Sequence, residues 1–325
     1  METIRWGIAG PGNIANKFAK AVKNVEGAQL VAVAARSLEK GQAFAQNHGI
    51  ARVFGSFEEM AFSDEVDAVY VSTPHPVHKD CAEIFLQAGK HVLCEKPLCV
   101  NAKQARQLRE CAKAHDVFLM EAIWTRFLPA VLELQKIIAS GELGQVMGLE
   151  ADFCYATTVE EEAKLFQNHI AGGSLLDVGI YGLNLAALLF GPQPQEIHAV
   201  SHVSDGVDLH TQTVLKYPNG AMASITSAIA LRKPETAYIY GTKGYVCLPT
   251  FYGAQELIVN TDGTDRRILK PSMGEGFEEE ILEVCACIRA GKKESDTMPL
   301  NETIRILEWM DEIRKKISVQ YPFDQ

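Results

Sequence analysis

The 325-residue sequence predicts an α/β protein of two domains: a doubly wound parallel sheet, then an α+β domain with a large, mostly antiparallel sheet. Three observations indicate this arrangement. Strands and helices alternate over the first part of the chain, a glycine-rich turn follows the first strand, and strands joined by turns dominate after Phe127. We place the domains at 1–122 and 123–325.

In the first domain, short apolar runs alternate with amphipathic segments. Predicted strands cover 4–9, 30–35, 68–72, 91–94 and 118–122, and predicted helices cover 13–22, 38–47, 77–88 and 101–115. Asn101, followed three residues later by Gln104, is typical of a helix N-cap. Strands joined by helices of this length require right-handed crossovers, which predicts a parallel sheet with both faces covered.

In the second domain, a helix over 130–140 precedes a long half-buried strand over 146–155, where apolar residues alternate. Further strands are predicted at 196–204, 211–217, 222–230, 237–240, 245–248 and 256–260, and helices at 277–290 and 302–317. The Asn219-Gly220 pair tolerates positive φ and indicates a hairpin turn. Consecutive strands of this kind predict a mostly antiparallel sheet.

Composition excludes several classes of protein. The chain has 31 basic and 41 acidic residues, a net charge of −10, which argues against a nucleic-acid partner. No uninterrupted apolar run approaches the ~18 residues of a membrane helix, and no leader is recognisable at the N-terminus. The eight cysteines are scattered and have neither metal-ligand nor disulfide-framework spacing. We therefore expect a cytoplasmic protein that binds no metal.

The glycine-rich turn indicates a dinucleotide-binding Rossmann domain. Gly10, Gly12 and Ala15 match the pattern G-x-G-x-x-G/A between a strand and a helix. The first glycine permits a tight turn, and the second lets a pyrophosphate approach the backbone. Asn13 and Ile14 begin the helix, whose free N–H groups suit an anion. We therefore expect cofactor contacts at Gly10, Gly12, Asn13 and Ile14.

The end of the second strand predicts NADP as the cofactor. An NAD site usually carries a carboxylate there, whereas this strand ends Ala35-Arg36-Ser37. Arg36 suits bidentate pairing with a 2′-phosphate, and Ser37 can donate a hydrogen bond to it. Lys40, one helical turn later, adds positive charge.

Three further segments carry a family resemblance: 72–78 (STPHPVH), 94–97 (CEKP) and 172–181 (GGSLLDVGIY). Together with the glycine-rich turn, they resemble the glucose–fructose oxidoreductase/inositol dehydrogenase (Gfo/Idh/MocA) family over essentially the whole chain. The stretch 118–127 (FLMEAIWTRF) resembles the branch of dimeric dihydrodiol dehydrogenases and NADP-dependent D-xylose dehydrogenases. That branch also has arginine after the second strand.

The resemblance implies hydride transfer between nicotinamide and a carbinol carbon of an aldose or vicinal diol. Such a reaction needs a group that takes the hydroxyl proton, and Lys96 and Tyr181 are the candidates. Asp177 lies four residues before Tyr181, so on a helix both share a face, and it orients the substrate hydroxyl or Lys96. Most relatives carry histidine at position 181, so the immediate proton acceptor, Tyr181 or Lys96, is left open.

Other residues are assigned by the resemblance alone. Cofactor contacts are implied for Thr73, Pro74, His75, Glu95, Lys96, Trp124 and Arg126, and substrate contacts for Trp124, Phe153, Asp177, Tyr181 and Phe277. For the three aromatic residues and for His78, core packing is the alternative. The resemblance also implies a cis bond before Pro97 and a homodimer formed through the second-domain sheet.

Two other functions stay open. One is a non-catalytic NADP-binding regulator, because the family includes a transcriptional co-repressor. The other is a reductase of other small carbonyl compounds. A pure sensor has no reason to retain Lys96, Asp177 and Tyr181 together, which favours the dehydrogenase.

Overall fold

The computed structural model describes residues 2–324 and divides into two compact units. The first comprises Met1–Trp124 and Met273–Ile304, and the second comprises Thr125–Ser272 and Arg305–Gln325. The first change of unit lies close to the predicted boundary at Ala122. The segment Met273–Ile304, which we expected in the second domain, groups instead with the first unit.

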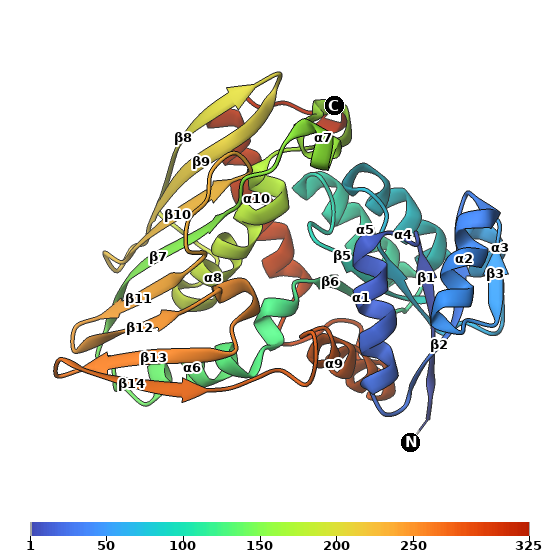
Figure 1. Ribbon diagram of the computed structural model, residues 1–325, viewed down its shortest axis with the longest axis horizontal. Coiled ribbons are helices and arrows are strands. Elements are labelled where there is room, and N and C mark those ends of the chain that lie inside the picture. The colour runs from blue at the N-terminus through green and yellow to red at the C-terminus, as the bar shows by residue number, and fades with distance from the viewer. Residues whose placement is uncertain (1, 325) are drawn as a thin grey trace. The chain divides into compact units, whose positions relative to one another are not determined.

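The first unit contains a six-stranded parallel sheet in the order β3-β2-β1-β4-β5-β6 (Figure 1). Its strands are β1 (Ile4–Ala9), β2 (Ala28–Ala34), β3 (Arg52–Phe54), β4 (Ala68–Val71), β5 (His91–Glu95) and β6 (Leu119–Ala122). The connecting helices are α1 (Asn13–Ala21), α2 (Leu38–His48), α3 (Phe57–Ala61), α4 (His78–Gln87) and α5 (Ala102–Ala114). This confirms the predicted doubly wound sheet, whose strand order reverses between β1 and β4. Sequence patterns missed β3 and α3, which are only three and five residues long.

Aromatic packing fills the centre of this unit. Phe18 of α1 stacks on Tyr70 of β4 with ring centroids 3.9 Å apart, and its edge meets Trp6 of β1 at 5.3 Å. All three side chains are fully buried. The first helix is thereby held against the two strands that border the reversal of strand order.

Helix α9 (Glu278–Arg289) belongs to the first unit because its two ends are bonded there. Asn24 donates a hydrogen bond to Glu278 Oε1 (2.9 Å), and Arg289 Nη2 donates to the carbonyl of Gly27 (2.7 Å). Periodicity reveals that a segment is helical but not which sheet it packs against. Its assignment to the second domain could not have been corrected from the sequence.

The second unit contains an eight-stranded sheet in the order β14-β13-β12-β11-β7-β10-β9-β8. Its strands are β7 (Val146–Cys154), β8 (Glu196–Ser204), β9 (Val207–Lys216), β10 (Met222–Ala228), β11 (Ala237–Gly241), β12 (Gly244–Leu248), β13 (Glu256–Thr261) and β14 (Thr264–Leu269). Among these strands only β7 and β10 pair in parallel, which confirms a mostly antiparallel sheet. Helices α6 (Pro129–Ala139) and α8 (Ile180–Phe190) pack on one face (Figure 1). Helix α10 (Leu300–Lys316) follows near the C-terminus and belongs to this unit from Arg305 onward.

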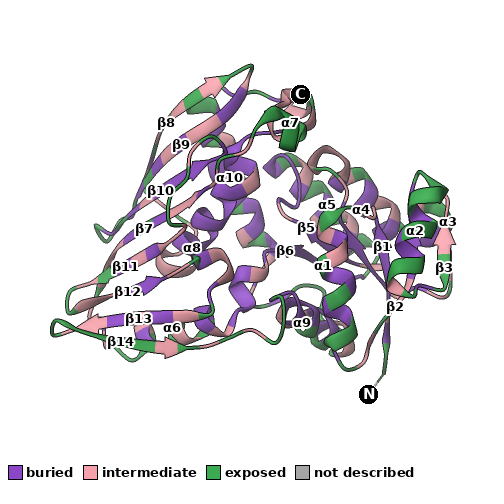
Figure 2. Cartoon of the chain, in the orientation of Figure 1, coloured by how far each residue is buried: buried purple, intermediate pink, exposed green. Residues whose placement is uncertain are grey.

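One helical stretch of the described chain, Asn168–Phe190, is long and apolar enough to cross a membrane by length and composition. Its most apolar window has a mean hydropathy of 1.5, and 78% of that window is buried inside the structure. Every residue of α8 from Ile180 to Ala187 is buried (Figure 2). This is the environment of a core helix. Counting uninterrupted apolar runs did not detect it, because small and polar residues interrupt the stretch.

A buried carboxylate holds this stretch at Ser174 and Leu175, just before α8. Asp208 Oδ2 on β9 accepts hydrogen bonds from Ser174 Oγ (2.7 Å), the Leu175 N–H (2.8 Å) and Thr211 Oγ1 (2.9 Å). Burial raises the pKa of Asp208 to about 6 although these donors oppose the shift. Gly173 has φ +121°, and a Cβ there would lie 2.2 Å from Asp208 Oδ1. Both conformation and space therefore require the second glycine of the motif.

We expect the stability difference between the native chain and Asp208→Asn to depend on pH between about 4 and 6. Because the folded-state pKa is raised, the folded chain holds a proton that the unfolded chain loses, so this residue's contribution falls as pH rises through the window. The variant has no group to titrate there. Urea unfolding at a series of pH values measures this. Between pH 4 and pH 7, the free energy of unfolding of the variant should rise relative to that of the native chain by roughly 2–3 kcal/mol.

The matched control is Asp205→Asn, because Asp205 is exposed on the turn before the same strand. Its stability difference should stay constant over this range. An equally constant difference for Asp208→Asn would contradict the assigned titration.

Candidate functional site

The glycine-rich turn of the first unit is packed against the loop that follows β4. Gly10 has φ +94°, its N–H donates to the carbonyl of Ala34 (3.1 Å), and its carbonyl accepts from Ser72 Oγ (2.9 Å). A Cβ at Gly10 would lie 3.1 Å from Thr73 Cγ2 and 3.2 Å from the Ser72 carbonyl oxygen. A side chain is therefore excluded at this position by both conformation and space.

The N-terminus of α1 suits an anionic group. Gly12 is the N-cap residue, no side chain of the described chain caps the helix there, and its first turn has no acidic residue. A Cβ at Gly12 would meet only the Ser72 carbonyl oxygen, at 3.9 Å. The glycine thus leaves room for a ligand, and Asn13 and Ile14 lie in the uncapped first turn, as a pyrophosphate requires.

The end of β2 presents positive charge. Arg36 is exposed and makes no hydrogen bond or ion pair within residues 2–324. Ser37 is the N-cap of α2, where its Oγ accepts a hydrogen bond from the Lys40 N–H (3.4 Å). Its hydroxyl proton remains a donor. With exposed Lys40 in the same turn, these groups have the chemistry that a phosphate monoester needs.

His78 links the loops that follow β4 and β5. It is buried, with Nδ1 2.8 Å from the Pro97 carbonyl oxygen and Nε2 2.7 Å from that of Thr73. Burial lowers the pKa of this imidazole, although both carbonyls oppose the shift. His78 thus packs internally, whereas Pro74 and His75 lie at the start of the neighbouring 3₁₀ turn, and His75 is only partly buried.

Glu95 supports the backbone that carries Lys96. The Tyr70 hydroxyl donates a short hydrogen bond to Glu95 Oε1, and Oε2 accepts from the Lys96 N–H (3.1 Å). The Lys96–Pro97 bond is cis, as the resemblance implied. Glu95 is buried, whereas the Lys96 side chain is partly exposed at the carboxyl end of β5. Lys96 therefore lies at the edge of the sheet where ligands bind in open α/β folds.

Two predicted aromatic residues of the first unit lie together. Trp124, after β6, stacks on Phe277 at the start of α9 with centroids 5.3 Å apart and planes 16° apart. Phe277 is buried and Trp124 is partly exposed. The pair therefore presents one partly exposed aromatic ring, that of Trp124, which is a property expected of a substrate wall.

Arg126, which we expected to contact the cofactor, is bonded within the second unit. Its Nε donates to Asn184 Oδ1 (3.1 Å) and its Nη2 to the Asn184 carbonyl (3.2 Å). The side chain is only 4% exposed. Asn184 lies on α8, one turn after Tyr181, so this guanidinium stabilises the helix that carries the predicted acid–base residue.

Asp177 and Tyr181 lie on the same helical stretch, but Asp177 lies before its regular α-helix begins. A π-helical turn, Leu175–Gly179, precedes α8 and contains Asp177. Such turns are frequent at functional sites. The Tyr155 hydroxyl, just beyond β7, donates to Asp177 Oδ2 (2.6 Å), and burial together with the Asp177 charge raises the pKa of Tyr155. Tyr155 continues the alternating pattern of its strand, so no sequence pattern marks it as a site residue.

Aromatic rings surround Tyr181, which is 7% exposed. Phe153 lies 5.4 Å away and Tyr252 6.0 Å away between ring centroids. Phe153 and Tyr252 stack face to face at 3.9 Å with planes 9° apart. Phe153 was predicted, whereas Tyr252 was missed because it lies in the turn Phe251–Gly253, where no periodic pattern exists. The ring of Tyr181 therefore packs against aromatic neighbours.

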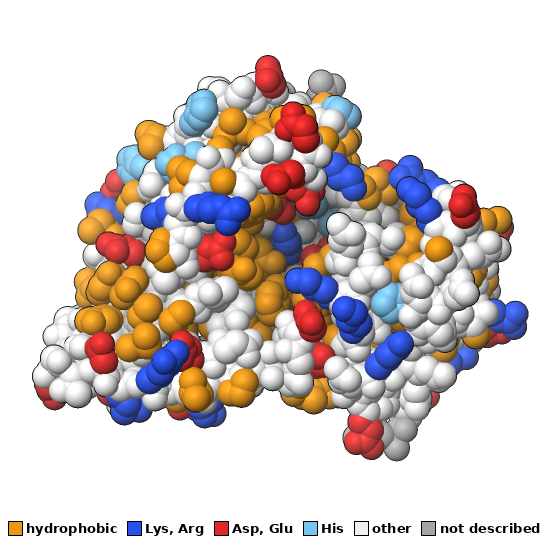
Figure 3. Space-filling model, in the orientation of Figure 1, with side chains coloured by type: hydrophobic (Ala, Val, Ile, Leu, Met, Phe, Trp, Pro, Cys, Tyr) orange, Lys and Arg blue, Asp and Glu red, His pale blue; other side chains and the backbone are white. Residues whose placement is uncertain are grey.

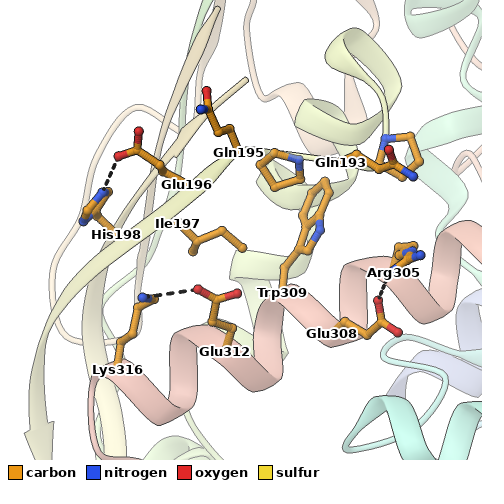
Figure 4. Close-up of a pocket in the computed structure, with 12 residues that line it drawn as sticks. Gln193, Gln195, Glu196, Ile197, His198, Arg305, Glu308, Trp309, Glu312 and Lys316 are labelled. Atoms are coloured by element: carbon orange, nitrogen blue, oxygen red, sulfur yellow. Dashed lines mark hydrogen bonds and ion pairs between the residues drawn. The ribbon is translucent and has the colours of Figure 1, made fainter. Parts of the chain in front are cut away.

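A surface pocket of about 510 Å³ lies elsewhere in the second unit, between the segment before β8 and α10 (Figure 4). Trp309 and Ile197 meet there, and the charged side chains around them include the pairs Arg305–Glu308 and Lys316–Glu312. None of the predicted site residues lines this pocket. Among residues 2–324, no group of three His, Cys, Asp or Glu side chains is arranged to hold a metal ion.

The two units offer different chemistry. The first unit offers a glycine turn, an uncapped helix N-terminus and an exposed cation pair, which together suit a dinucleotide phosphate. The second offers a carboxylate and a phenol on one helical stretch beside stacked aromatic rings. A phenol and a carboxylate can orient a hydroxyl group and move its proton.

Comparison with known proteins agrees with this division. Residues 4–123 match a family model described as an oxidoreductase family with an NAD-binding Rossmann fold, and residues 131–247 match a Gfo/Idh/MocA C-terminal domain. The chain is 38% identical over 334 residues to a mouse (Mus musculus) trans-1,2-dihydrobenzene-1,2-diol dehydrogenase, and 39% over 332 residues to that of zebrafish (Danio rerio). Each alignment covers 99% of both proteins.

Among solved structures, an aldose-aldose oxidoreductase from Caulobacter crescentus is similar, with a TM-score of 0.90, 25% identity and 98% of both chains covered. Fold, motifs and full-length similarity lead to one assignment. The chain belongs to the Gfo/Idh/MocA family of oxidoreductases.

Proposed function

We propose that this chain is an NADP-dependent dehydrogenase that transfers a hydride between nicotinamide and a carbinol carbon of a vicinal diol or an aldose. The full-length relatives are named for a trans-dihydrodiol, and the solved neighbour for an aldose. The observation that carries the proposal is the setting of Tyr181: a buried phenol one helical turn from Asp177, against the Phe153–Tyr252 stack. An apolar ring bearing a hydroxyl group suits these neighbours.

NADP is the cofactor proposed for the first unit. Arg36 and Ser37 would hold the 2′-phosphate, and the first turn of α1 the pyrophosphate. When bound, NADP supplies the nicotinamide that exchanges the hydride. Thr73, Pro74 and His75, at the carboxyl end of β4, are proposed to line its ribose and nicotinamide side.

Lys96 and Tyr181 are proposed to act as one acid–base unit. A tyrosine with an ordinary pKa near ~10 is a poor base at neutral pH, and an ammonium group favours its ionised form. Asp177, held by Tyr155, has one carboxylate oxygen bonded to a phenol and is proposed to orient the substrate hydroxyl. Intact Lys96, Asp177 and Tyr181 support an enzyme over a regulator of the same fold.

A homodimer is proposed through the outer face of the second-unit sheet. Register places Val200, Val214, Met222 and Tyr240 on one face, and all four are exposed (36–70%). Figure 3 shows hydrophobic side chains gathered over β7, β11 and β12. A self-complementary two-fold contact would cover them. A cytoplasmic location is proposed as well, since all eight cysteines are free thiols and seven of them are buried.

Arg36→Ala should erase most of the preference for NADP(H). We expect the native chain to bind NADPH at least tenfold more tightly than NADH, about 1.4 kcal/mol, because the guanidinium pairs with the 2′-phosphate. Calorimetric titration with both cofactors measures this. Arg232→Ala, an exposed arginine of the second unit, is the control and should change neither affinity. Equal affinities in the native chain would overturn the cofactor assignment.

Lys96→Met and Tyr181→Phe should each lower kcat by roughly 10²–10⁴-fold while NADPH binding persists. The double variant should lose far less than the product of the single losses, because residues that act as one unit are not additive. Steady-state kinetics on a trans-dihydrodiol and on D-xylose measure both effects. Lys113→Met, exposed on α5, is the matched control. Near-normal turnover in both single variants would refute the mechanism.

Light scattering at micromolar concentration should give twice the 35.7 kDa mass of the chain. Met222→Glu should yield the monomer, since it places a charge in the proposed apolar contact. Phe62→Glu, at an 81% exposed position of the first unit, should stay dimeric. A monomeric native chain would rule the interface out.

A further inference from the structure

Tyr252 is held by two hydrogen bonds in addition to the stacking of its ring. Its ring stacks on Phe153 at 3.9 Å, and its carbonyl accepts a hydrogen bond from Thr125 Oγ1 (2.6 Å). Its hydroxyl donates to Glu235 Oε2 (3.4 Å). A phenylalanine would make the same stack, so the hydroxyl and its carboxylate partner need a separate explanation.

The backbone at Glu235, and at Thr250 two residues before Tyr252, adopts a conformation that residues other than glycine rarely take. Glu235 has φ +61° and Thr250 has φ +47°, both in the left-handed region. The Phe251 N–H donates to the Glu235 carbonyl (3.0 Å), which joins the two segments. Such conformations persist where the surrounding structure imposes them, often at ligand sites. Here they bring a carboxylate to the hydroxyl of Tyr252.

The protonation of the pair determines what it can bind. Burial and the Glu235 charge raise the pKa of Tyr252, so the phenol keeps its proton and donates a hydrogen bond to Glu235. An ionised carboxylate has about four acceptor positions, and the described contacts of Glu235 use one of them. Glu235 is only partly buried, so further donors can reach it. The pair is therefore an acceptor-rich polar group at the edge of an aromatic surface.

We propose that Tyr252 and Glu235 form a subsite for a second substrate hydroxyl, adjacent to the one that is oxidised. This inference rests on the proposed function, in which the reacting hydroxyl lies at Tyr181. The Tyr181 and Tyr252 rings meet edge to face, 6.0 Å apart. A cyclic diol lying on the Phe153–Tyr252 stack would present its reacting hydroxyl to Tyr181. Its neighbouring hydroxyl would donate to Glu235, whose carboxylate is held in place by the hydrogen bond from Tyr252, and a mono-alcohol would leave this acceptor unmatched.

The test compares a cyclic trans-1,2-diol with the cyclic mono-alcohol that lacks the second hydroxyl. Tyr252→Phe keeps the ring stack and removes one oxygen atom, and Glu235→Gln keeps the shape of the side chain and removes its charge. Each should raise the KM for the diol roughly tenfold to a hundredfold, the range for a hydrogen bond to a charged group. Values for the mono-alcohol should stay unchanged, so the preference for the diol disappears.

Tyr217→Phe is the matched control, because the buried Tyr217 hydroxyl has no hydrogen-bond partner within residues 2–324. It should change the KM for neither the diol nor the mono-alcohol. Thermal melting of each variant reports whether it is folded, and Glu235→Gln tests the subsite if Tyr252→Phe does not fold. An equal rise in KM for the diol and the mono-alcohol would contradict the subsite, because Tyr252 would then only position Tyr181. Unchanged KM values in both variants would overturn the subsite outright.

A second readout separates this inference from the proposed function. Calorimetric titration of the diol into the NADPH-bound protein measures affinity without turnover. If the native chain oxidises neither diols nor sugars, the proposed function fails. The subsite still stands if diol binding weakens in Tyr252→Phe, and it falls if binding is unchanged.

Discussion

The second unit depends on one buried carboxylate. Asp208 accepts three hydrogen bonds on a single oxygen, and two of the donors, Ser174 and Leu175, lie at the start of the π-helical turn that precedes α8. The same stretch carries the carboxylate that Tyr155 holds, the phenol of Tyr181, and Asn184, which binds a buried guanidinium. Hydrogen bonds thus connect the sheet to this helical stretch at Leu175 and Asp177, and a third contact joins Asn184 to Arg126. The aromatic rings of Phe153 and Tyr252 pack beside Tyr181.

The parallel sheet of the first unit could be predicted because its determinants are local. A glycine turn, an N-cap such as Asn101 and runs of buried apolar residues each act within a few positions of the chain. The structure adds what such patterns do not contain, namely the partners of each side chain. Glu95, for example, supports the Lys96 backbone, and Ser37 caps a helix. Their predicted contacts with cofactor remain predictions.

Residues missed in the second unit are those whose partners lie far away in the chain. Tyr155 reads as one more alternating strand residue until Asp177 is placed beside it. Tyr252 lies in a short turn between strands, where sequence patterns carry little information, yet its ring completes the stack with Phe153. The same limit explains why α9 was expected in the second domain although it groups with the first unit. Periodicity identifies an element, and only three-dimensional packing identifies its neighbours.

The discontinuity of the first unit affects how the protein can be made. Its last segment, Met273–Ile304, is encoded after nearly all of the second unit. During synthesis from N- to C-terminus, the Trp124–Phe277 stack and the bonds from Asn24 and Gly27 to α9 must wait until most of the chain has left the ribosome. The parallel sheet therefore spends most of translation without the helix that completes it. A gene fragment that stops after residue 124 would encode an incomplete cofactor domain, so exchanging this domain between relatives requires two splices.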